Sequence, residues 1–227
     1  MISKPYKCEY CESSFSKEST LFAHSCEQKR RHLQKNEKHV VLGYQTFVKF
    51  YQKSVNYKGI KTYEEFCKSP YYNAFIKFGS YLNNVRPLYT EKYIEHIVTS
   101  GIKLDQWCRD EHYEKYVIEL IKKESVETAL ERSIDTMTAW ANDKNSLWTH
   151  YFMYASTNRI VWDIRDGKVS PWLLLNCKTG MQALSEFNDE HLNMLVNVLD
   201  PSHWAMKFKR HPADIELVKE IVRQAGL

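Results

Sequence analysis

Apolar residues recur every three to four positions along most of this chain, which is the spacing of amphipathic helices. The pattern first becomes regular between residues 38 and 54, where one stripe contains Val40, Val41, Tyr44, Phe47, Val48 and Tyr51. The same spacing predicts helices over residues 62–68, 70–85, 90–100, 104–123, 125–141, 147–164, 171–184, 189–199, 201–209 and 212–224. The pattern therefore predicts about ten short helices joined by brief turns.

Residues that start and stop helices support these boundaries. Thr62 followed by Glu65 is typical of a capping box, and Ser69-Pro70 and Ser170-Pro171 are typical N-cap and first-turn pairs. Asp166-Gly167 leaves an alternative open, because it also suits the tip of a β-hairpin between residues 160–164 and 169–174. Aromatic residues every three to four positions before this dipeptide favour the helix.

Composition agrees with a mainly α protein. The chain of 227 residues has only 7 glycines and 6 prolines, which disfavours a turn-rich β-sandwich or barrel. Hydrophobic residues make up 43% and charged residues 26%, so global disorder is excluded, and the 14% of aromatic residues suits a well-filled core. We expect a small separate module with a basic extension over residues 1–35 and one compact all-α domain over residues 36–227.

The first 35 residues carry the most specific chemistry. Cys8 and Cys11 are two residues apart, and His24 follows after twelve more. This segment resembles the two-cysteine, two-histidine zinc fingers, whose pattern is matched at Tyr6, Cys8, Cys11, Phe15, Leu21 and His24. The resemblance implies a small ββα fold around one structural Zn²⁺, and a segment this short needs the metal in order to fold.

The fourth ligand departs from the family pattern. Gln28, Lys29 and Arg30 occupy the places where the family has its second histidine. Cys26 is the nearest candidate, but residues two apart point in different directions on a helix, so the helix must unwind after His24. His32 is the alternative, and it requires the chain to loop back. We expect the metal ligands to be Cys8, Cys11, His24 and Cys26.

The other three cysteines, Cys67, Cys108 and Cys177, are far apart among apolar residues and are expected to be buried, inert thiols. Such a distribution fits a reducing compartment better than a disulfide framework. The N-terminus lacks the apolar core of a signal peptide, and no run of eighteen apolar residues occurs. These features predict an intracellular protein that does not enter membranes.

Positive charge gathers near the N-terminus and suggests nucleic acid. The net charge is +4, and residues 1–60 contain eleven Lys or Arg against five Glu. In the finger family, the positions that read bases correspond to Lys17, Thr20 and Ala23. The basic residues expected to contact phosphates are Lys29, Arg30, Arg31 and Lys35. A weaker basic patch lies at residues 207–210. The alternatives are a solvated basic face and a finger that docks protein.

Enzymatic motifs are lacking in the sequence. It has no Gly-rich phosphate loop, no H-E-x-x-H and no nucleophile elbow. Asp163 with Asp166, and Asp105 with Asp110-Glu111, are carboxylate pairs that are better explained as charges at helix ends or on solvent faces. We therefore expect a protein without catalytic activity.

A longer resemblance covers nearly the whole chain. Residues 69–75 and 167–175 look similar to uncharacterised proteins of large tailed bacteriophages, which implies action on DNA or its machinery in an infected bacterium. The favoured function is a nucleic-acid-binding accessory protein in replication, transcription or packaging, with DNA preferred over RNA as partner. The alternatives are an adaptor that binds a protein of that machinery and, third, a nuclease. No membrane or small-molecule substrate is expected.

Overall fold

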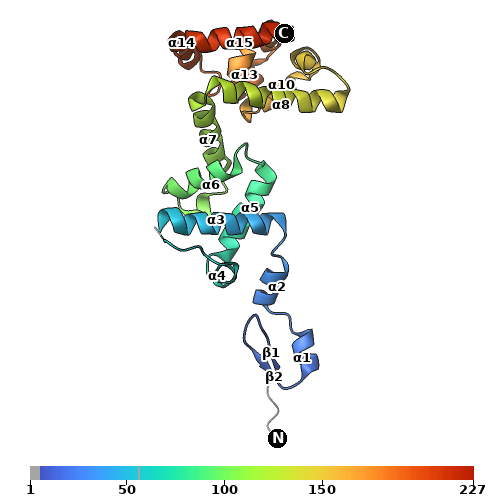
Figure 1. The fold of residues 1–227 in the computed structure, drawn as a ribbon, viewed down its shortest axis with the longest axis vertical. Helices are drawn as coiled ribbons and strands as arrows, with labels where there is room; N and C mark the ends of the chain where they lie inside the picture. The colour runs from blue at the N-terminus through green and yellow to red at the C-terminus, as the bar shows by residue number, and fades with distance from the viewer. Residues whose placement is uncertain (1–5, 56) are drawn as a thin grey trace. The chain divides into compact units, whose positions relative to one another are not determined.

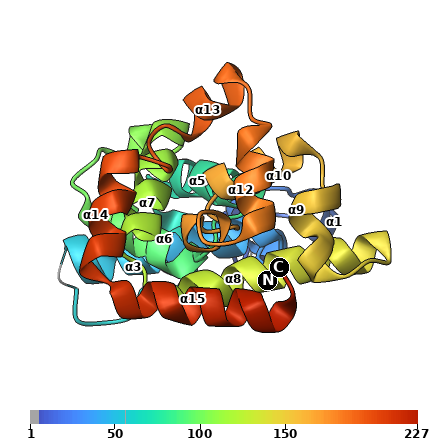
Figure 2. The same ribbon diagram turned by 90° about the horizontal axis from the view of Figure 1, so that it is seen from above.

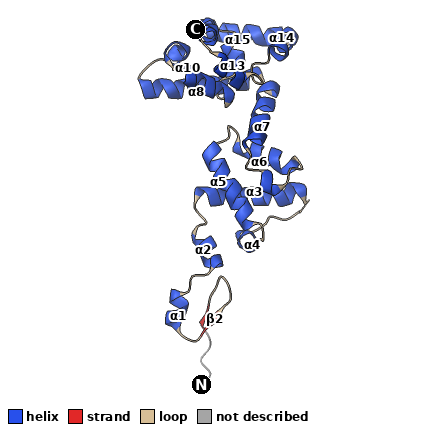
Figure 3. Ribbon diagram, turned by 180° about the vertical axis from the view of Figure 1, so that it is seen from behind, coloured by secondary structure: helices blue, strands red, loops and turns tan. Residues whose placement is uncertain are grey.

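The computed structural model describes residues 6–55 and 57–227, and the chain divides into two compact units, Met1–His112 and Tyr113–Leu227. Figure 3 shows that the described residues are helical apart from one small hairpin and the connecting loops. The expected fold class, a mainly α protein that begins with a small ββα element, is therefore confirmed. The expected boundary at residues 35 and 36 concerns independent folding and stays a prediction, and residues 1–5 lie outside the described range.

The first unit begins with the hairpin and continues as helices (Figure 1). Its elements are β1 (Tyr6–Lys7), β2 (Ser14–Phe15), α1 (Glu18–Ala23), α2 (Glu27–Leu33), α3 (Lys38–Ser54), α4 (Tyr63–Lys68), α5 (Tyr72–Val85), α6 (Thr90–Thr99) and the 3₁₀ helix η1 (Leu104–Gln106).

Helix α7 (Asp110–Lys123) starts just before the boundary between the units. The second unit then contains α8 (Val126–Lys144), the 3₁₀ helix η2 (Trp148–His150), α9 (Tyr151–Tyr154), α10 (Thr157–Arg165), α11 (Pro171–Leu174), α12 (Lys178–Ser185), α13 (Asp189–Leu195), α14 (Pro201–Arg210) and α15 (Pro212–Ala225). Figure 2 shows the sharp turn from α14 into α15, which occurs at His211-Pro212.

Two glycines let α3 and α5 pack closely in the first unit. A Cβ atom on Gly79 of α5 would lie 2.1 Å from the carbonyl oxygen of His39 on α3. A Cβ atom on Gly43 of α3 would lie 2.8 Å from the carbonyl oxygen of Phe75. Because only a residue without Cβ fits at these points, the two glycines set the distance between the helices.

Aromatic rings fill the cores of both units, as the composition predicts. In the first unit Phe75 lies 5.5 Å from Phe47 and 6.1 Å from Trp107 between ring centroids, and all three side chains are buried. In the second unit Trp172 and Trp204 are 5.7 Å apart and also buried. Edge-on and tilted contacts of this kind add to the free energy of apolar burial.

Several predicted helices are divided in the structure. The helix expected over residues 147–164 breaks at Ala155, where the backbone is extended, and Ser156 caps the start of α10. The segment expected over residues 171–184 forms α11 and α12, with Cys177 as the N-cap of the second. In both places a side chain accepts a hydrogen bond from the new helix's first turn, so a short helix can begin.

The residues expected to mark helix starts and turns can be compared with the structure one by one. The capping box is present, since the Thr62 hydroxyl accepts from the Glu65 amide and the Glu65 carboxylate accepts from the Thr62 amide. Residues before Asp166 are helical, so the hairpin alternative is wrong. The N-cap expected at Ser69 lies instead at Tyr71, whose amide donates to the Ser69 hydroxyl. Among the described residues, no helix is long and apolar enough to span a bilayer.

Candidate metal centre

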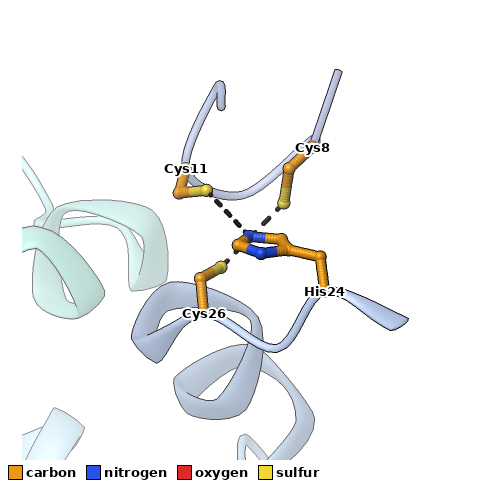
Figure 4. Close-up of side chains that lie close together, drawn as sticks. All are labelled: Cys8, Cys11, His24 and Cys26. Carbon is orange, nitrogen blue, oxygen red and sulfur yellow. Dashed lines mark hydrogen bonds between the residues drawn. The ribbon is translucent and has the colours of Figure 1, made fainter. Parts of the chain in front are cut away.

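The first two cysteines lie on a tight turn between β1 and β2. Tyr6 pairs with Phe15 and Lys7 with Ser14, and the amide of Cys8 donates to the carbonyl of Ser13 at 2.9 Å. The amide of Glu12 donates back to the carbonyl of Cys8, also at 2.9 Å, and Glu12 adopts a φ of 62°. This turn brings the thiols of Cys8 and Cys11 to the same side of the hairpin (Figure 4).

The third and fourth side chains come from an extended stretch between two helices. Helix α1 ends at Ala23, and His24 has φ −68° and ψ 121°. Cys26 has φ −97° and ψ 162° and is the N-cap of α2. In an extended chain residues two apart point to the same side, so both side chains can face the two cysteines. The expectation that the helix unwinds near His24 is confirmed.

The four side chains converge on one point (Figure 4). Their ligand atoms all lie within 4.8 Å of one another. The sulfurs of Cys8 and Cys26 are 3.9 Å apart, and the sulfur of Cys11 is 3.2 Å from Nε2 of His24. Ligand atoms about 2.3 Å from a central ion in a tetrahedron lie about 3.8 Å from one another. The cluster therefore has the dimensions to hold one metal ion.

The thiols differ in how readily they ionise. Hydrogen bonding with the side chain and backbone of Ser13 lowers the pKa of Cys11 to about 6. Desolvation raises the pKa of Cys26, and the amide of Lys29, which donates to its sulfur at 3.3 Å, acts in the opposite direction. A metal ion requires thiolates, and its charge favours ionisation of both groups.

Neighbouring groups hold the side chain of His24 in place. The Phe15 ring lies 4.7 Å from the His24 ring, and Nζ of Lys29 donates to the carbonyl of His24 at 3.4 Å. Contacts of this kind orient the ligands of metal sites. Phe15 and Leu21, the apolar residues of the finger pattern, are half-buried.

His32, the alternative fourth ligand, does not belong to this cluster. Its ring lies 5.0 Å from that of Tyr10 and 5.6 Å from that of Tyr63, between centroids. His32 therefore packs between the hairpin and α4, and the arrangement favours Cys26 as the fourth ligand.

The predicted base-reading residues are accessible. Lys17 is the N-cap of α1, Thr20 and Ala23 lie on that helix, and all three are exposed. Of the predicted phosphate contacts, Arg30 and Lys35 are exposed and Lys29 is half-buried. These six residues keep surface that a ligand can reach.

Arg31, the remaining predicted phosphate contact, is buried. Its guanidinium donates to the carbonyl of Cys67 and to the carboxylate of Glu27, and lies 4.1 Å from the centre of the Tyr72 ring. The hydroxyl of Tyr63 donates to the carbonyl of Arg31 at 2.7 Å. In this structure Arg31 links α2 to α4 and α5, and its side chain is not accessible to a phosphate.

Two features were not predicted from the sequence. Phe22 on α1 is 85% exposed, although its type suggested nothing unusual within the finger pattern. Asp163 is buried and ion-paired, whereas a solvent-face or helix-end charge was expected. An arginine four residues before Asp163 was the available signal, because that spacing permits an ion pair on one helix face.

The remaining cysteines lie away from the cluster. Cys67 and Cys177 are buried, as expected, and Cys108 is half-buried.

Comparisons of the chain with protein-family models, with curated proteins and with solved structures give no match. The resemblance to bacteriophage proteins therefore stays a prediction.

Proposed function

We propose that Cys8, Cys11, His24 and Cys26 bind one structural Zn²⁺, and that the protein is a non-enzymatic nucleic-acid-binding accessory protein. The convergence of four ligand atoms within 4.8 Å carries the proposal. Three thiolates and an imidazole form a donor set that suits zinc and is poor for Mg²⁺ or Ca²⁺. Because four protein ligands complete a tetrahedron, no position is left for the reactive water of a catalytic site.

The positive residues beside the centre support contact with a phosphate backbone. Lys29, Arg30 and Lys35 belong to α2 or follow it directly, and Cys26 caps the same helix. Zinc binding would thus hold these cations next to the preceding helix, which carries Thr20 and Ala23 and is capped by Lys17. Zn²⁺ with three thiolates has a net charge of −1, so the attraction for phosphate depends on these surface cations.

Fluorescence anisotropy with a labelled DNA duplex tests this function in the full-length protein. Replacing Lys29, Arg30 and Lys35 by Gln removes three phosphate contacts. It should reduce the slope of log affinity against log salt by about 2.7, at about 0.9 per contact. The matched control replaces the exposed Lys58, Lys68 and Lys103 by Gln, which changes the net charge equally. Equal effects of the two triple variants would reject a site at α2.

Phe22 favours a second function, that of an adaptor which docks a protein. An aromatic side chain that is 85% exposed adds nothing to the finger's own core, and aromatic residues are common anchors of protein interfaces. In a pull-down after nuclease treatment, Phe22→Ala should then lose a partner that wild type retains. Leu33→Ala, which alters a residue that is 74% exposed, is the control. Retention of every partner by Phe22→Ala would reject the adaptor.

A further inference from the structure

Helix α10 and the turn after it form a pocket in the second unit, separate from the metal centre. Its volume is about 260 Å³, and it is lined by Asn158, Arg159, Trp162, Asp163, Asp166 and Lys168. The pocket therefore combines one large aromatic face with two cations and two carboxylates.

Trp162 is the unusual member of this group. Its side chain is 53% exposed, whereas Ile160, Val161 and Ile164 on the same helix are buried. The core contacts of α10 are thus made by its aliphatic residues and do not need the indole. The guanidinium of Arg165 lies 5.0 Å from the centre of the ring, a cation–π contact that helps to hold the indole in place.

The buried carboxylate of Asp163 organises the polar side of the pocket. It accepts hydrogen bonds from the Tyr151 hydroxyl at 2.8 Å and from Nε of Arg159, and Nζ of Lys168 lies 3.6 Å away. The side chains of Arg159 and Lys168 nevertheless stay 50% and 42% exposed. Asp163 therefore anchors two cations at the rim and leaves part of each accessible to a ligand.

A third cation lies beside the pocket, since the guanidinium of Arg165 is placed over the indole of Trp162. Asp166 is paired with Arg165 at 2.9 Å and with Lys168 at 3.5 Å, so neither carboxylate is without a cation. The six lining residues carry two cations and two carboxylates, and Arg165, which lies outside the lining, brings the cations around the pocket to three.

We propose that this pocket binds an unpaired nucleobase together with its phosphate. The base stacks on Trp162, and Arg159 and Lys168 contact the phosphate. A volume of about 260 Å³ lies below the roughly 300–1,000 Å³ of pockets for drug-sized molecules, which suits one base. A base inside a duplex has no free face for the indole, so the ligand is a single strand or a free nucleotide. Assigning it to a strand rests on the proposed function.

Titration of the full-length protein with fluorescein-labelled oligo-dT, followed by anisotropy, tests this site. Loss of one stacking contact by Trp162→Ala should weaken binding about 5-fold or more. Trp162→Phe should retain most of the affinity, because it keeps an aromatic face. Tyr154→Ala, which removes a 70% exposed aromatic residue outside the pocket lining, should bind as wild type does. Thymidine monophosphate is titrated in parallel as the free nucleotide.

Each outcome bears on the site. Binding of oligo-dT that weakens in Trp162→Ala supports the site. If only thymidine monophosphate binds, and its binding also depends on Trp162, the site is supported but its ligand is a free nucleotide and not a strand. Equal binding by Trp162→Ala and wild type overturns the site, as does no binding of either probe. If only the variant at Lys29, Arg30 and Lys35 weakens DNA binding, this inference fails while the proposed function stands.

Discussion

Glu12 adopts a left-handed backbone conformation directly after the second cysteine, with φ 62°. A residue with a Cβ atom loses roughly 1 kcal/mol in this conformation, and glycine does not. We expect Glu12→Gly to raise the free energy of unfolding of the zinc-loaded protein by about 1 kcal/mol, less the entropy that glycine adds to the unfolded chain. Thermal unfolding in the presence of zinc measures the effect. Glu9 does not have a left-handed backbone conformation. If Glu9→Gly raised the free energy of unfolding by the same amount, the strain at Glu12 would not be responsible for the effect.

Substitutions of the neighbouring arginines Arg30 and Arg31 on α2 should have different effects on stability and on DNA binding. Arg31→Ala removes the donor to the Cys67 carbonyl and should cost about 2 kcal/mol in the free energy of unfolding. Arg30→Ala, at an exposed position, should stay within about 0.5 kcal/mol of wild type and instead weaken DNA binding. Urea unfolding and DNA anisotropy on the same samples separate the two effects. Equal unfolding midpoints for the two variants would contradict the role given to Arg31.

The role of a single residue could be predicted from the sequence where its partners are near in the chain. The spacing of Cys8, Cys11 and His24 follows from the local geometry of a cysteine turn and a short helix, and the sequence was enough to find them. Burial of Arg31 depends on Cys67 and Tyr72, which lie 36 and 41 positions further along the chain. A pattern read along the sequence does not contain such contacts.

The close packing of α3 against α5 can be tested at Gly79. Ala has a better helix propensity than Gly by about 1 kcal/mol, so an unconstrained Gly79→Ala would stabilise α5. A Cβ atom at this position would lie 2.1 Å from the His39 carbonyl, however, and the helices would have to separate. We expect a net loss of about 2 kcal/mol in the free energy of unfolding, measured with urea.

The control for this variant lies on the same helix. Asn73 is exposed on α5, so Asn73→Ala should gain a few tenths of a kcal/mol from propensity alone. Stabilisation by both variants would show that the glycines do not limit the approach of α3 and α5.

His203 on α14 makes the second unit sensitive to acid. Desolvation, with the nearby charges of Lys122 and Lys207, lowers the pKa of this imidazole in the folded protein, and Asp200 acts in the opposite direction. Because the unfolded chain takes up the proton first, stability falls as the pH drops below about 6.5 and is unaffected above it. Thermal unfolding between pH 7.5 and about 5 should show a smaller decline for His203→Asn than for wild type. Parallel declines would contradict this origin.

Helices were predicted well where apolar periodicity is unbroken. The stripe over residues 38–54 corresponds to α3, Lys38–Ser54, and the capping box marked the start of α4. Periodicity continues across the breaks at Ala155 and between α11 and α12, because the apolar residues on both sides enter the same core. Ser156 was a usable start signal there, whereas a cysteine such as Cys177 is an unusual N-cap.

The division of the chain into two compact units was not predicted from the sequence. The boundary between His112 and Tyr113 falls within α7, so no stretch rich in glycine, proline or serine marks it. The cluster of three cysteines and one histidine, in contrast, was predicted with all four residues, because Cys26 is the nearest suitable donor after His24. The end of the helix before His24 was expected for the same reason, because His24 and Cys26 face the other two side chains only from an extended chain.

The metal content of the purified full-length protein tests the central claim most directly. Native mass spectrometry, with elemental analysis of the same samples, should find one zinc ion per chain in wild type and in His32→Asn. Cys26→Ser should lose most of that zinc, because it removes one of the four ligands. Full retention of zinc by Cys26→Ser, or loss of zinc from His32→Asn, would contradict the centre formed by Cys8, Cys11, His24 and Cys26.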